Sequence, residues 1–79
     1  MEREVVSLYK LPIGKSGRVK MLTANGNIRR RLMDLGLVEN TVVEALRKSP
    51  SGDPTAYQFR GTVIALRSEE ASNIFVHVC

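Results

Sequence analysis

The stretch Asn27–Leu37, with the sequence Asn-Ile-Arg-Arg-Arg-Leu-Met-Asp-Leu-Gly-Leu, carries the clearest helix signal in the chain. Three apolar side chains recur at the spacing of one helix face: Ile28, Leu32 and Leu35. Asn27 is suited to cap the first turn, and Gly36 to adopt the left-handed conformation that ends a helix. About two turns of helix are not stable alone in water, so we expect the three apolar side chains to be buried against neighbouring strands.

The opposite face of this predicted helix carries positive charge around a methionine. A rotation of about 100° per residue places Arg29, Arg30 and Met33 together on that face. Arg31 flanks the apolar stripe. Positive side chains in a first turn oppose the helix dipole, at a cost of about 0.3–1 kcal/mol each when exposed. We interpret this face as a surface that contacts a partner; a solvated polar face is the alternative.

Outward from the helix, short alternating segments predict five β-strands. Residues 5–11 are apolar but are followed by Pro12, so we expect a lead-in loop there. The first strand follows, with Val19 and Met21 on its buried face. The turn Glu39-Asn40 leads to a β-branched strand over residues 41–47, in which either face is a candidate for burial.

The second half of the chain continues the strand pattern. Residues 55–60 alternate, with Tyr57 and Phe59 on one face, and a tight connection at Gly61-Thr62 leads to a buried strand over residues 63–66. Ser68 is suited to cap a short helical turn before the last strand. The last strand turns three side chains the same way: Ile74, Val76 and Val78. Five strands with one short inserted helix predict a small, mainly β, highly curved antiparallel barrel, with the helix closing one end.

Composition predicts one domain over residues 1–79 and a cytoplasmic location. The single cysteine excludes an internal disulfide and agrees with a reducing compartment. No apolar run approaches the roughly 20 residues that span a bilayer, and the N-terminus lacks the features of a signal peptide.

The net charge of +4 arises in the first half of the chain. Residues 1–40 contain eight Lys and Arg against four Asp and Glu, whereas residues 41–79 contain four of each. Such a patch suits an acidic protein surface or phosphates. Nucleic acid is the less favoured partner, because Tyr57 and Phe59 are expected in the core and leave few aromatic platforms for bases.

Several motifs together resemble one known family. They are Arg29–Leu37, Val43-Glu44, Gly52-Asp53-Pro54, Phe59-Arg60-Gly61, Ile64–Arg67 and Glu69-Glu70-Ala71. In this order and spacing, the chain resembles FeoA-type proteins of bacterial ferrous-iron transport over nearly its whole length. Asn40 departs from the family pattern, since many relatives carry glycine before the strand.

The resemblance implies an SH3-like β-barrel and a cytoplasmic partnership with FeoB, a membrane transporter for Fe(II) with a cytosolic GTP-hydrolysing domain. The protein would be recruited to the inner face of the membrane by this partner. A related domain ends some metal-dependent repressors of the DtxR type, so a metal-responsive regulatory domain is an alternative. The chain carries no DNA-binding helix-turn-helix, which favours the transport accessory.

The sequence offers little support for catalysis, for a cofactor or for a small-molecule substrate. There is one histidine and no Walker-type glycine loop. His77 and Cys79 supply two soft ligands, whereas a first-row metal site typically needs three or four. We therefore expect neither an enzyme nor a metal carrier. The candidate partner-binding residues are Arg29, Arg30, Arg31, Met33, Leu37, Gly52, Asp53 and Pro54.

Overall fold

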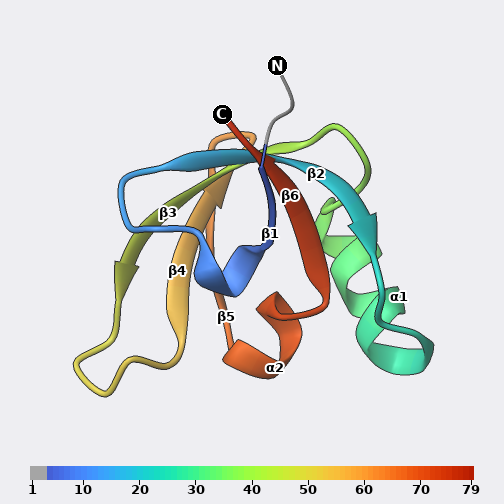
Figure 1. Cartoon of the computed structure of the whole chain (residues 1–79). Coiled ribbons are helices and arrows are strands. Elements are labelled where there is room, and N and C mark those ends of the chain that lie inside the picture. Colours follow the sequence, from blue (N-terminus) through green and yellow to red (C-terminus); the bar gives the residue numbers. More distant parts are fainter. Residues whose placement is uncertain (1–3) are drawn as a thin grey trace.

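The backbone forms one antiparallel sheet that curves around the hydrophobic core (Figure 1). The computed structural model describes residues 4–79. Within these residues the strands lie in the order β1-β6-β2-β3-β4-β5. The elements are β1 (Val5–Ser7), the 3₁₀ helix η1 (Leu8–Lys10), β2 (Ser16–Leu22), α1 (Gly26–Leu35), β3 (Val42–Lys48), β4 (Thr55–Phe59), β5 (Thr62–Leu66), α2 (Ser68–Ala71) and β6 (Ile74–Val78).

The predicted fold class is confirmed, but the predicted number of strands is wrong. The described residues form six strands, because Val5–Ser7 is a strand and not a lead-in loop. It pairs with β6, and Val6 lies opposite Val76. This pairing joins the two ends of the chain, so no local pattern of residues signals it.

Two irregularities in the sheet decide which side chains are buried. The register of β2 shifts between Val19 and Met21, so Val19 is buried while Met21 is 50% exposed. The prediction that both lie on one buried face is therefore wrong. In β3 the register shifts after Ala45, and of the two candidate faces it is Val43 and Ala45 that are buried.

The strand β5 lies at an edge of the sheet and is less buried than predicted. Only Leu66 is fully buried in it, and Val63 is 51% exposed. The connection from β4 is the pair Arg60-Gly61, one residue earlier than expected, with φ of 52° and 76°. Positive φ at both residues is the requirement of the two-residue turn that matches the twist of a hairpin.

The helix α1 is present but differs from the prediction at its start and on its buried face. It begins at Gly26 with Asn25 in the N-cap position, and ends at Gly36 with φ of 101° as predicted. Leu32 is fully buried and Leu35 half-buried, but Ile28 is 37% exposed. The predicted three-residue stripe is therefore only partly buried.

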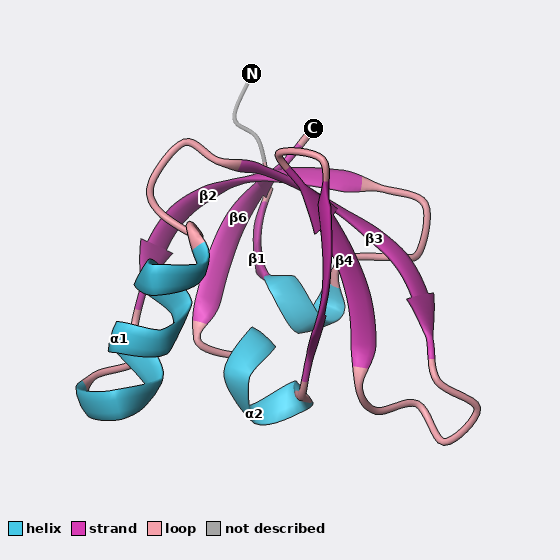
Figure 2. Cartoon of the chain, turned by 180° about the vertical axis from the view of Figure 1, so that it is seen from behind, coloured by secondary structure: helices cyan, strands magenta, loops and turns pink. Residues whose placement is uncertain are grey.

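The helices lie at different sides of the curved sheet. Figures 1 and 2 show α1 beside β2, whereas α2 lies at the lower opening next to η1, which it contacts. The helix α1 was predicted to close one end of the barrel, but it lies at the side of the sheet. Within the described residues, neither α-helix has the length and hydropathy needed to span a membrane.

The core draws side chains from most of the elements. Tyr57 and Phe59 are buried as predicted, so neither aromatic ring is available to stack on a base. Among residues 4–79, the buried hydrophobic residues are Leu8, Leu11, Val19, Ala24, Leu32, Leu37, Val43, Ala45, Tyr57, Phe59, Leu66, Ala71, Ile74 and Val76.

Candidate functional site: an exposed basic groove beside α1

The outward face of α1 is exposed where the sequence predicts it. Arg29 and Arg30 are exposed, and Met33 keeps 44% of its surface in contact with solvent. No acidic residue lies in the first turn of α1, so no negative side chain in that turn offsets the unfavourable interaction of these positive charges with the helix dipole.

A groove runs between this face and strand β2, and we call it the methionine groove. Its volume is about 340 Å³, and it is lined by Lys20, Met21, Leu22, Arg29, Met33, Val38 and Glu39. The Arg29 Nη1 atom donates a hydrogen bond to the Leu22 carbonyl oxygen across 3.4 Å, which ties α1 to the end of β2. Two exposed methionines 12 positions apart in the chain, Met21 of β2 and Met33 of α1, therefore line the same groove.

Met21 and Lys20 are members of this groove that the sequence analysis did not predict. Strict alternation places Met21 beside Val19 in the core, and only the bulge of β2 turns it outward. A bulge leaves no unambiguous mark in a single sequence, so the groove was not predictable from the helix stretch alone.

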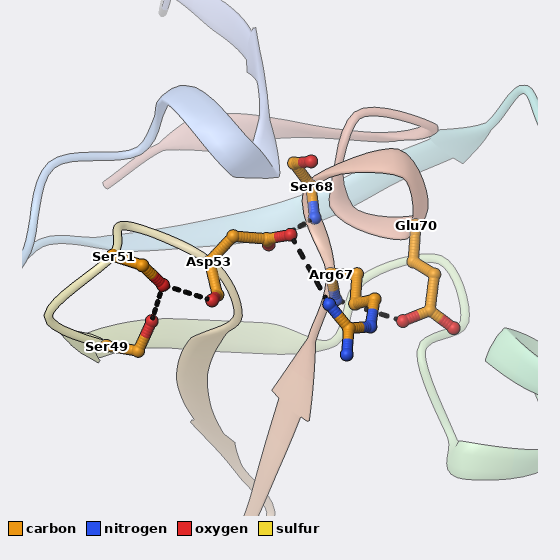
Figure 3. A network of polar contacts seen from close by, with 6 residues as sticks. All are labelled: Ser49, Ser51, Asp53, Arg67, Ser68 and Glu70. Carbon is orange, nitrogen blue, oxygen red and sulfur yellow. Dashed lines mark hydrogen bonds and ion pairs between the residues drawn. The ribbon is translucent and has the colours of Figure 1, made fainter.

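Arg31 has a different environment from its two neighbours. Its guanidinium forms an ion pair with Glu70, whose side chain is largely buried. The Glu70 Oε1 atom also accepts a hydrogen bond from the Arg67 N–H at 3.0 Å, part of the network in Figure 3. Arg31 thus connects α1 to α2, and we assign it to positioning the helix.

The Gly52-Asp53-Pro54 loop is held by a network of its own. The Asp53 Oδ1 atom accepts a hydrogen bond from the Ser68 N–H at 2.7 Å, and Oδ2 lies 3.8 Å from the Arg67 Nη1 atom (Figure 3). Asp53 therefore supplies the acceptor at the start of α2. The prediction that Ser68 caps this helix is wrong, since Arg67 occupies the N-cap position.

The candidate partner-binding residues do not form a single surface. Arg29 and Met33 line the methionine groove, whereas Arg31 and Pro54 line a second depression, of about 350 Å³, with Arg67. Leu37 is fully buried, so it lies beneath the surface and not on it.

The two candidate metal ligands lie at the C-terminal end of the chain. His77 is half-buried on β6, and Cys79 is exposed just after that strand. Residues 4–79 contain no cluster of three or more His, Cys, Asp or Glu side chains arranged to hold a metal ion.

The curved antiparallel sheet and its short helices define a small, mainly β domain of the SH3-like type. Its sequence agrees with one family: the model of the FeoA domain matches residues 6–78. The chain therefore belongs to the FeoA family, whose members are small accessory domains with a role in ferrous iron transport. None of the curated proteins compared with the chain matches it.

Solved structures of family members share the fold. The FeoA protein from Chlorobium tepidum is 38% identical, with a TM-score of 0.85 over 92% of this chain and 70% of that one. The FeoA-like protein from Clostridium acetobutylicum is 33% identical, with a TM-score of 0.88 over 99% and 90%. The Stenotrophomonas maltophilia FeoA, complexed with zinc, is 37% identical, with a TM-score of 0.79 over 87% and 86%. That protein is described as a prokaryotic SH3-domain protein and a candidate activating factor of ferrous iron transport.

Proposed function

We propose that this chain is a non-enzymatic, cytoplasmic accessory protein of ferrous iron uptake that binds the cytosolic portion of FeoB through the methionine groove and the adjoining arginines. Membership of the FeoA family supports a role in ferrous iron uptake, and the exposed groove supports action by binding a partner. Binding would recruit the protein to the inner face of the membrane and would assemble or regulate the transporter. Iron would pass through the partner and not through this chain.

The groove is the observation that carries the proposal. Met21 and Met33 are 50% and 44% exposed, and methionine side chains adapt readily to the shape of a bound partner. Lys20, Arg29 and Arg30 border these apolar groups with three positive charges, against the two negative charges of Asp34 and Glu39. The matching partner surface is apolar at its centre and acidic around it, since complementary charge favours the correct partner and excludes others.

Charge reversal on the helix tests the proposal. Replacing Arg29 and Arg30 by Glu places anions near a helix N-terminus, which the dipole favours by about 0.3–1 kcal/mol each. The same change removes the exposed Arg29–Leu22 hydrogen bond, worth about 0.5–1.5 kcal/mol, so the two effects offset and the free energy of unfolding should change by less than about 1 kcal/mol. Against an acidic partner the same change produces repulsion. Titration calorimetry with the cytosolic portion of FeoB should show affinity at least tenfold weaker, about 1.4 kcal/mol.

A matched control distinguishes the effect of a change at the groove from the effect of a change in net charge. The variant Lys15→Glu/Arg47→Glu changes the net charge equally at two exposed positions outside the groove, and it should bind like the parent chain. Parent binding should also weaken between low salt and about 0.5 M salt, because exposed charges are screened over the Debye length. Equal loss of affinity in both double variants, or none in either, would refute the assignment of the groove.

A further inference from the structure

The strand β5 lies at an edge of the sheet, and neither its sequence nor its register carries a feature that prevents strand pairing. Its sequence, Thr62-Val63-Ile64-Ala65-Leu66, contains no charged residue and no proline. Its register with β4 continues without a bulge from Phe59–Thr62 to Thr55–Leu66. Natural proteins commonly protect long edges with charges, prolines or bulges. The opposite edge, β1, has three residues and is protected by its shortness.

The register defines which backbone groups of β5 point outward. Alternate residues of an antiparallel strand direct both the N–H and the C=O to the same neighbour. The pair Phe59–Thr62 closes a two-residue turn and is therefore a hydrogen-bonded pair, so the groups of Thr62, Ile64 and Leu66 point to β4. The groups of Val63 and Ala65 consequently point away from the sheet.

These four outward groups have no partner within the described residues. No backbone hydrogen bond outside the regular ladder involves Val63 or Ala65, and no strand lies beyond β5 in the sheet. Both side chains are exposed, Val63 by 51%. Two residues that each offer a donor and an acceptor, separated by one position, match the backbone of an extended chain and not that of a helix.

The surroundings indicate what kind of extended chain fits. In Figure 1, α1 lies on the side of β5 that faces away from β4. Arg31 of α1 and Ala65 of β5 line the same depression of about 350 Å³, together with Arg67, Glu69 and Glu70. A single strand would lie beside β5 in that space, whereas a second copy of the chain would bring its own β4 toward α1. The bordering charges are two arginines and two glutamates, so they require no net charge of the occupant.

We propose that β5 receives an extended, largely uncharged and β-branched segment of the protein partner, which adds to the sheet as a further strand through the backbone groups of Val63 and Ala65. The inference rests on the proposed function for the partner, but it names a second contact, on the other side of α1 from the methionine groove. The backbone bonds would give affinity, and Val63 and Ala65 would select small or β-branched neighbours.

Amide hydrogen exchange tests the proposal at single residues. In the ¹⁵N-labelled chain alone, the amides of Val63 and Ala65 should exchange quickly, while that of Ile64, bonded to β4, is protected. Saturation with the cytosolic portion of FeoB should slow exchange at Val63 and Ala65 at least tenfold. The variant Val63→Pro lacks one outward N–H but keeps every bond to β4, so it should stay folded and bind at least tenfold more weakly; Val63→Thr should bind like the parent chain.

The possible outcomes separate this inference from the proposed function. In one outcome, calorimetry shows binding that Arg29→Glu/Arg30→Glu weakens, but the amides of Val63 and Ala65 still exchange quickly in the complex. This result would refute strand addition and retain the groove as the contact surface. If the FeoB portion does not bind at all, both are refuted. If the two amides become protected in the chain alone as its concentration rises, and sedimentation shows a dimer, a second copy occupies the edge and the partner segment is refuted.

Discussion

Leu32 is the side chain that fixes α1 to the core. It is fully buried, whereas Ile28, one turn earlier on the same face, is 37% exposed. Leu32→Ala should therefore lower the free energy of unfolding in urea by about 2–5 kcal/mol, as truncation of a core leucine does. Ile28→Ala should cost less than half as much. A cost below about 0.5 kcal/mol for Leu32→Ala would show that this contact does not hold the helix.

Tyr57 makes the fold sensitive to alkaline pH. Burial raises the pKa of its hydroxyl from the ordinary value of 10.0 to about 12. Between these two pH values the unfolded chain releases the proton that the folded chain retains, so stability present below pH 10 is lost as the pH rises toward 12. The loss should be about 1.4 kcal/mol per pH unit.

Urea unfolding at pH 9 and 11.5 checks this contribution. Tyr57→Phe should remove most of the alkaline loss, and Tyr9→Phe, at the half-buried tyrosine, should leave most of it in place, because burial is the larger cause of the raised pKa of Tyr57. An unchanged alkaline loss in Tyr57→Phe would assign the effect to other groups.

Among the elements, α2 depends on a side chain from a distant loop. Asp53 accepts the Ser68 N–H at the first residue of this four-residue helix. Asp53→Ala should therefore cost about 0.5–2 kcal/mol, the range for loss of a helix cap. Asp53→Asn retains an oxygen acceptor and should cost less. Comparable losses in the two variants would mean that the carboxylate charge, facing Arg67, matters more than the hydrogen bond.

The elements were predictable from sequence where local signals agree. Gly36 ends α1, and alternation buries Tyr57 and Phe59 in β4, because periodicity and turn chemistry are properties of neighbouring residues. The strand β1 and the exposed face of Met21 were missed. Both depend on pairing with β6, which lies more than 50 positions away along the chain.

For the candidate site, too, features set by neighbouring residues were predictable, and contacts between distant residues were not. Arg29, Arg30 and Met33 lie on an exposed helix face that periodicity predicts. The role of Asp53 was not predictable, since the motif gives no indication that its carboxylate reaches Ser68, 15 positions later. Nor does the motif indicate that Leu37, which follows the end of α1, is fully buried.

At the scale of the whole molecule, α1 stands between the two surfaces proposed to contact the partner. The methionine groove separates it from β2, and the depression lined by Arg31 and Ala65 separates it from β5. Arg29 connects the helix to Leu22 on one side, and Arg31 connects it to Glu70 on the other. A partner that engages both surfaces would enclose α1, so the orientation of this helix should control both contacts.

Ferrous iron uptake by cells that carry Arg29→Glu/Arg30→Glu in place of the parent chain is the most direct test of the docking surface. Uptake should fall to near the rate of cells that lack the chain, with the variant as abundant as the parent and with normal uptake for Lys15→Glu/Arg47→Glu. Uptake at the parental rate and at parental abundance in the Arg29→Glu/Arg30→Glu cells would refute the assignment of the methionine groove as the docking surface.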